Sequence, residues 1–338
     1  MYEIFIAGGI SFLITFLFMP FWMKKARSIG LTGKDMNKYD KPEIPETGGI
    51  VVFFGFIAGI LFLTLLYYLW NDMNTVYYYL ASMISLSIIT IIAYMDDISG
   101  WKKGFARWKK PILTSIAVLP LIPFIINRTD ITLIGIPIEL PYLFYPLVLV
   151  PIGFIGATNA VNLLGGFNGL EAGLGLIACA TLMWFSYGTI FFPLMFVAFF
   201  SILAFFWYNR YPSRVFPGDT FTYFLGGLLA IFAVLGRYQT ATILIMMPYL
   251  LEGIIKSREI PYILKHRKTF RPECFGRVLK DNSLQEPYKE VWSLTHIFIK
   301  LIRKLKGKCY ENDVTTTILT IYATWCLFII AVYIWVLV

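Results

Sequence analysis

Long uncharged stretches alternate with short polar segments along the whole chain. Most of these stretches approach the roughly 20 apolar residues that a bilayer-spanning helix needs. The pattern therefore predicts an all-α fold, a polytopic membrane protein with about ten transmembrane helices. The apolar runs are Ile4–Met23, Gly48–Trp70, Val76–Met95, Pro111–Asn127, Tyr142–Leu164, Gly169–Tyr187, Thr189–Tyr208, Thr220–Gly236, Tyr238–Ile255 and Val314–Val338.

The polar connections differ in their content of Lys and Arg. When they are numbered in order, the odd-numbered connections hold 27 of the 29 basic residues, and the even-numbered ones hold only Arg128 and Arg237. Because basic loops stay on the cytoplasmic side, we expect both termini outside and the basic loops inside. The simplest organisation is a single transmembrane domain over residues 1–338, including a cytoplasmic loop at about 257–313.

The amino-acid composition agrees with a membrane protein and indicates which classes of partner the chain binds. Hydrophobic residues make up 58% of the chain and charged residues 14%, which indicates lipid as the main solvent. The net charge of +9 favours membrane lipid headgroups and phosphates as partners, although the same residues could serve topology alone. We expect no nucleic-acid partner. Four cysteines without a CxxC motif or a His/Cys cluster predict neither a disulfide framework nor a zinc site.

Asp96-Asp97 stands at the inner end of the third apolar run. Adjacent carboxylates repel each other, and the C-terminal end of a helix disfavours anions. This placement predicts a Mg²⁺ ion or a basic partner, and Lys109-Lys110 at the start of the next run is a candidate partner. The alternative is an exposed pair that water and interfacial lysines solvate.

The sequence NAVNLLGGFNGLEAG at residues 159–173 joins two apolar runs through a short polar turn. Asn159 and Asn162 lie three apart and therefore share one helix face. Gly165, Gly166 and Gly169 would let a flat ligand approach the backbone. The alternative is close helix packing, because Gly169 and Gly173 fit a small-residue interface, but packing does not account for the asparagines.

Three further polar segments fall on the same predicted face. Asp219, in YPSRVFPGDT, starts an apolar run, where it is placed either to cap the helix or to hold Mg²⁺. The basic cluster KHRK at 265–268 suits phosphate and sugar oxygens, or a surface-binding patch. GKDMNK at 33–38 and PETGG at 45–49 also fit a loop that only sets topology.

The motifs GKDMNK, IPETGG, MDD, NAVNLLGGFNGLEAG, YPSRVFPGDTF and KHR occur in this order between Gly33 and about Arg267. In this order they resemble the polyprenyl-phosphate N-acetylhexosamine-1-phosphate transferases, most of all the eukaryotic and archaeal UDP-GlcNAc:dolichyl-phosphate GlcNAc-1-phosphate transferases. The resemblance implies ten transmembrane helices with a cytoplasmic active site, in an archaeal plasma membrane or an endoplasmic reticulum membrane. It also implies a homodimer.

The reaction implied by the resemblance moves GlcNAc-1-phosphate from UDP-GlcNAc to dolichyl or another polyprenyl phosphate. UMP leaves, and the product begins lipid-linked oligosaccharide synthesis for protein N-glycosylation. The implied cofactor is Mg²⁺, with Mn²⁺ as an alternative. Two other interpretations stay open: the same transfer with another donor such as UDP-GalNAc, and a transporter of anionic lipids or nucleotide sugars. A cluster at one face without repeated halves disfavours the transporter.

Residue roles follow from the resemblance only where the motifs match. Those implied for the acceptor phosphate are Asp96, Asp97 and Lys110, and those implied for Mg²⁺ are Asp219 and Asn162. Those implied for the UDP-sugar are Gly166 and Phe216 on the two faces of the uracil, Asn168 at its edge, Lys265, His266 and Arg267 at the pyrophosphate and sugar, and Glu46 and Asn159 in support. Lys265 replaces an arginine of the eukaryotic pattern, and so keeps the charge without the bidentate geometry.

Overall fold

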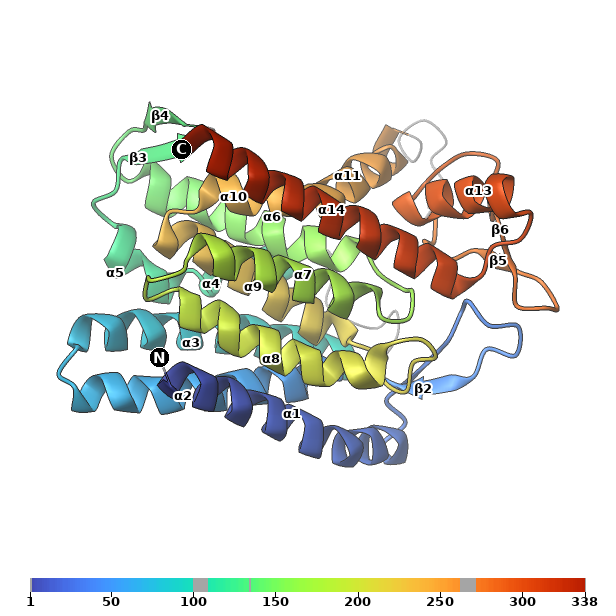
Figure 1. Cartoon of the computed structure of the whole chain (residues 1–338), viewed down its shortest axis with the longest axis horizontal. Helices are drawn as coiled ribbons and strands as arrows, with labels where there is room; N and C mark the ends of the chain where they lie inside the picture. The colour runs from blue at the N-terminus through green and yellow to red at the C-terminus, as the bar shows by residue number, and fades with distance from the viewer. Residues whose placement is uncertain (1, 100–108, 134, 262–271, 338) are drawn as a thin grey trace.

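The computed structural model describes residues 2–99, 109–133, 135–261 and 272–337, and most of them are helical (Figure 1). All ten predicted apolar runs fold into helical segments. The helical elements are α1 (Tyr2–Ser28), α2 (Gly49–Leu69), α3 (Met73–Ile98), α4 (Lys109–Ile116), η1 (Leu119–Leu121), α5 (Ile122–Ile125), η2 (Tyr145–Leu149), α6 (Val150–Leu163), α7 (Leu170–Phe185), α8 (Phe192–Asn209), α9 (Gly218–Gly236), α10 (Gln239–Ile245), α11 (Met247–Ser257), α13 (Leu294–Lys306) and α14 (Glu311–Leu337).

Seven helical segments in the described part of the chain are long and apolar enough to cross a membrane, and the bent pair α10 and α11 would make an eighth. Two of the predicted runs are interrupted for a local reason. Pro120 and Pro123 lack the backbone N–H that a helix needs, and the run Pro111–Asn127 accordingly breaks into α4, η1 and α5. Pro248 lies just after the 62° bend between α10 and α11.

The centre of the bundle is α9, which packs against α2, α3 and α6. Close approach of α6 and α9 depends on Gly226, where a Cβ atom would lie 2.6 Å from the Cα of Thr158. The outer helices α1 and α14 instead expose many apolar side chains, such as Phe5 and Phe21. Such an outward apolar surface fits a lipid environment.

The two ends of the bundle differ. Both chain termini lie at one end, together with the hairpin of β3 (Asp130–Leu133) and β4 (Ile136–Glu139). The opposite end, which we call the α13 end, carries α13 and two further antiparallel hairpins (Figure 1). These hairpins pair β1 (Thr32–Lys34) with β2 (Glu43–Pro45), and β5 (Arg277–Val278) with β6 (Leu284–Gln285). The described candidate site residues all lie towards the α13 end.

Candidate active site

A lysine joins two carboxylates at the α13 end. Lys110, in the first turn of α4, places Nζ 2.5 Å from Oδ2 of Asp96 and 2.8 Å from Oδ2 of Asp219. The two carboxylates come from the last turn of α3 and the first turn of α9. The ion pair expected between Asp96 and Lys110 is therefore present. All three side chains are partly accessible, so the cluster can meet a charged ligand.

Asp97 has a different environment from its neighbour. Its carboxylate accepts hydrogen bonds from the backbone N–H of Asp219 (2.9 Å), the backbone N–H of Thr220 (3.1 Å) and the Thr220 hydroxyl (2.6 Å). The first N–H groups of a helix have no partner within the helix, and the helix dipole favours an anion there. Asp97 thus caps α9 from a neighbouring helix.

This arrangement corrects the prediction that Asp219 could cap its own helix. The helix α9 already begins at Gly218, so Asp219 lies inside the first turn, and its side chain is directed to Lys110 instead. Gly218 has φ +70°, and a Cβ atom at this position would lie 2.5 Å from Oδ2 of Asp97. Only glycine suits such a backbone next to the capping carboxylate.

The asparagines of α6 lie on one face, as their spacing predicts. The Asn162 side-chain oxygen accepts a hydrogen bond from the Thr222 hydroxyl at 2.9 Å, and the Asn159 oxygen accepts one from Tyr223 at 3.2 Å. The Thr222 hydroxyl also contacts the backbone oxygen of Asp219 at 3.1 Å. The amide of Asn162 is therefore fixed relative to the turn that carries Asp219.

Glu46 adds negative charge beside this cluster. It precedes α2, and its backbone oxygen accepts a hydrogen bond from the Trp22 indole at 3.0 Å. Burial raises the pKa of the Glu46 carboxyl above its ordinary value, and the nearby charge of Asp219 raises it further. The site thus combines several carboxylates with one lysine, and it favours cations.

The oxygen atoms present suit a magnesium ion that shares its coordination with a ligand. Mg²⁺ prefers oxygen ligands and is usually held by one or two carboxylates together with substrate phosphates. Asp219 and Asn162 supply a carboxylate and an amide oxygen close to one turn. Among the described residues, no group of three or more His, Cys, Asp or Glu side chains could hold a metal ion alone. The donor set fits a site that phosphate oxygens complete.

The glycine turn between α6 and α7 is held by protein groups. Gly166 (φ +86°) donates its N–H to Glu171 at 2.9 Å, and its carbonyl accepts from the Asn37 amide at 2.9 Å. A Cβ atom on Gly166 would lie 2.7 Å from the ring of Phe275. Close helix packing explains Gly173, where a Cβ atom would lie 2.6 Å from Leu319. Close packing is therefore present at Gly173, whereas the approach of a flat ligand to Gly165 and Gly166 stays a prediction.

The other residues predicted for the nucleotide site differ in burial, and three of them lie outside the described residues. Asn168 is almost fully buried, and its side chain makes hydrogen bonds within the protein. Phe216 is partly buried, and its backbone N–H donates to Pro45 at 2.8 Å. The basic residues Lys265, His266 and Arg267 lie outside the described residues. The uracil and pyrophosphate roles stay predictions.

Sequence reasoning missed several residues of this region. Thr220 contacts Asp97, Glu171 contacts the glycine turn, and Glu311 contacts Asn168. Glu311 lies three positions before the last apolar run, where one acidic residue gives no local signal. The motif GKDMNK was noticed, but its topological interpretation concealed the contacts that Asp35 and Lys38 make.

Comparisons with known proteins identify the family. The model described as glycosyl transferase family 4 matches residues 78–237. A protein of Saccharolobus solfataricus, provisionally named UDP-N-acetylglucosamine–dolichyl-phosphate N-acetylglucosaminephosphotransferase, is 32% identical over 309 residues, which cover 87% of each chain. The chain belongs to glycosyl transferase family 4. The family membership predicted from the ordered motifs is confirmed.

Two more relatives of this family 4 protein carry the same activity in their names. One from Sulfolobus acidocaldarius, also provisionally named, is 31% identical and covers 86% of each chain. The enzyme of Dictyostelium discoideum is 27% identical over 79% of this chain and 76% of its own length. The segment matched by the family model contains Asp96, Lys110 and Asp219, whereas Lys38 and Glu311 lie outside it.

Proposed function

We propose that this chain transfers GlcNAc-1-phosphate from UDP-GlcNAc to dolichyl or another polyprenyl phosphate and releases UMP. The observation that carries the proposal is Lys110 between Asp96 and Asp219 at one end of an apolar helix bundle. A fixed cation there can meet the phosphate of a lipid whose chain lies along the bundle. The names of the relatives supply the donor and the acceptor. We further propose that the product begins lipid-linked oligosaccharide synthesis for protein N-glycosylation.

The proposed chemistry is a direct displacement. An oxygen of the acceptor phosphate attacks the β-phosphorus of the donor, a new P–O bond forms, and the bond from that phosphorus to the bridging oxygen breaks. The bridging oxygen leaves with UMP. Because a phosphate monoester has a second pKa of about 6, the attacking oxygen is already largely ionised at neutral pH. Asp96 accepts a remaining proton, and Lys110 orients the acceptor phosphate.

The proposed cofactor is Mg²⁺, with Mn²⁺ as an alternative, held by Asp219 and the amide oxygen of Asn162. Its contribution would be to neutralise charge on the donor diphosphate, which phosphoryl transfer requires more than covalent help. Lys110 then exchanges one carboxylate partner for phosphate oxygens. Asp97 does not touch the substrate in this scheme, because its oxygens bind the first turn of α9.

We also propose a membrane arrangement with ten spans, both termini outside and a cytoplasmic active site, in the plasma membrane of an archaeon. The basic connections of the sequence support this orientation. The short helix α7, the interrupted run at 111–127 and the bent pair α10 and α11 would supply the spans beyond those that are long enough alone.

The test is transfer of tritium-labelled GlcNAc-1-phosphate from UDP-GlcNAc to dolichyl phosphate by the purified full chain. We expect butanol-extractable label that depends on Mg²⁺ and is lost in Asp219→Ala. Asp130→Ala is the matched control, because Asp130 forms an exposed ion pair with Arg237 at the other end of the bundle. Transfer only from UDP-GalNAc would change the donor, and no transfer from any UDP-sugar would refute the proposed reaction.

A further inference from the structure

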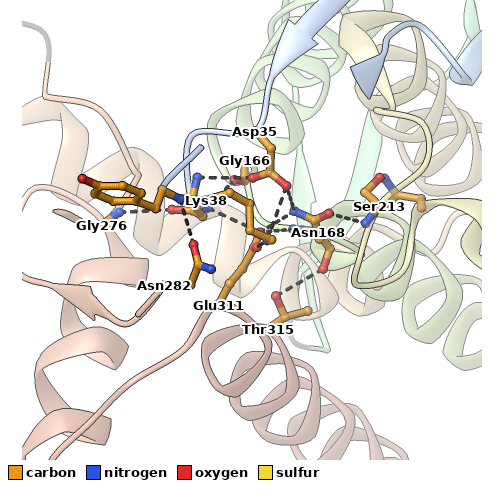
Figure 2. Close-up of polar contacts among 12 residues, drawn as sticks. Asp35, Lys38, Gly166, Asn168, Ser213, Gly276, Asn282, Glu311 and Thr315 are labelled. Carbon is orange, nitrogen blue, oxygen red and sulfur yellow. Dashed lines mark hydrogen bonds and ion pairs between the residues drawn. The ribbon is translucent and has the colours of Figure 1, made fainter. Parts of the chain in front are cut away.

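A buried polar network connects parts of the chain that are far apart in sequence. Figure 2 shows Asn168 between Asp35, Ser213, Glu311 and Thr315. Asp35 follows β1, Asn168 lies in the glycine turn, Ser213 precedes α9, and Glu311 opens α14. The network therefore joins the first polar loop, the turn between α6 and α7, and the last helix.

Both the nitrogen and the oxygen of the Asn168 side-chain amide make hydrogen bonds inside this network. Its side-chain nitrogen donates to Asp35 at 3.1 Å and to Glu311 at 2.5 Å. Its side-chain oxygen accepts from the backbone N–H of Ser213 at 2.5 Å. Its backbone N–H donates to Glu311 at 2.8 Å. With two donated protons and one accepted bond, the orientation of this amide is set by its neighbours, most of all by Glu311.

Glu311 is itself held by an ion pair. Its side chain is 2% exposed, and its second oxygen pairs with the ammonium of Lys38. Lys38 also lies 3.4 Å from Asp35 and 4.4 Å from the centre of the Tyr211 ring. Although burial acts to lower it, the carboxylates of Glu311 and Asp35 hold the pKa of Lys38 above its ordinary value. A buried, paired carboxylate is costly to disrupt and restricts its partners to one geometry.

The same loop also holds the backbone of the glycine turn. Asn37 donates to the carbonyl of Gly166 at 2.9 Å and lies 3.5 Å from Glu311. Its own side-chain oxygen accepts from Gly276 at 3.3 Å. The position of the turn at residues 165–169 thus depends on groups outside the turn, which come from both ends of the sequence.

We propose that Glu311, together with Asp35 and Lys38, positions the glycine turn at residues 165–169 for the nucleotide of the donor, and so controls donor affinity without contacting the donor. This inference rests on the proposed function for the existence of a UDP-sugar donor. It differs from a purely structural role of Glu311, which would affect the donor, the acceptor and the folded state together.

The experiment measures binding of UMP to the purified full chain by titration calorimetry, beside initial rates with varied donor and varied acceptor. Glu311→Gln removes the charge opposite Lys38 while keeping the shape of the side chain. Because hydrogen bonds to charged groups contribute strongly, we expect UMP affinity to fall about tenfold, with the same change in the donor KM. The acceptor KM and kcat should stay within about twofold of the wild type.

Two further variants make the result specific. Lys38→Gln should weaken UMP binding in the same way, and in the double variant the second change should add little, because the pair acts as one unit. Glu286→Gln is the matched control, since it likewise removes the charge of an ion pair, in this case the pair that Glu286 forms with Arg303 of α13. It should leave UMP affinity unchanged.

Different results would overturn the inference and the proposed function. UMP affinity within twofold of the wild type in Glu311→Gln would overturn the inference. A parallel loss of donor binding, acceptor binding and melting temperature would also overturn it, in favour of a structural role. A wild-type protein that transfers no sugar phosphate and binds no UMP would instead refute the proposed function on which the inference depends.

Discussion

The cap that Asp97 provides to α9 makes the hydroxyl of Thr220 important for activity. Thr220→Val replaces this hydroxyl with a methyl group of similar size and removes only the 2.6 Å hydrogen bond to Asp97. Thr220 is fully buried and is not among the residues expected to contact substrate. A loss of activity would therefore act through Asp97 and the adjacent Asp219.

The expected fall in kcat/KM of Thr220→Val follows from the kind of hydrogen bond that is lost. A hydrogen bond to a charged group contributes about 1.5–3 kcal/mol. If half of the larger value is expressed as displacement of Asp219 from Lys110, kcat/KM falls about tenfold, because 1.4 kcal/mol corresponds to a factor of ten. The two backbone N–H groups that remain on Asp97 limit the damage.

The assay is UMP release at saturating acceptor, with thermal unfolding measured in parallel. Thr64→Val is the control, because Thr64 is also buried and its hydroxyl donates within α2, to the backbone oxygen of Ile60 at 2.7 Å. In Asp97→Asn the same Thr220 change should have little additional effect. A kcat/KM of Thr220→Val equal to that of the control would refute the capping argument.

Other predictions follow from single contacts. Because the pKa of Glu46 is raised in the folded state, the contribution of Glu46 to stability is greatest below its ordinary pKa and falls as the pH rises through the folded value. Glu46→Gln should therefore raise the melting temperature relative to wild type more at pH 7 than at pH 4. The same difference in melting temperature at both pH values would contradict this prediction. Gly166→Ala and Gly188→Ala both place alanine at positive φ, which costs about 1–2 kcal/mol. A Cβ atom on Gly166 would lie 2.7 Å from the Phe275 ring, whereas one on Gly188 would meet no described atom within 4 Å. UMP affinity should therefore fall in Gly166→Ala and stay unchanged in Gly188→Ala. Gly226→Ala should separate α6 from α9 at Thr158. This should reduce kcat at least tenfold, since a displacement of about 1 Å can lower the rate about 100-fold. A fully active variant would show that α6 tolerates the shift.

Local patterns in the sequence predict the helical framework well. Apolar runs give the position of every span-like segment, and a spacing of three correctly places Asn159 and Asn162 on the face that meets α9. The expected pairing of Asp96 with Lys110 also follows from local reasoning, because two adjacent carboxylates at a helix end require a cation.

Local sequence patterns do not predict that Asp96 and Asp97 have different partners. Successive residues of a helix point about 100° apart, so Asp96 and Asp97 must differ, but the direction of each depends on where α9 begins. Glu311 was missed for the same reason, because its partner Lys38 is 273 positions away. Contacts of this range depend on the packing of helices that no single segment specifies.

The buried pair of Lys38 and Glu311 has a consequence for biosynthesis. Lys38 is translated 273 positions before Glu311, which opens α14. The turn at residues 165–169 can reach its final position only after α14 is inserted. A nascent or truncated chain that still contains Asp96, Lys110 and Asp219 would then lack a competent nucleotide site. Through Glu311, α14 therefore makes the nucleotide site depend on a segment that is translated after the residues of the lysine and aspartate cluster.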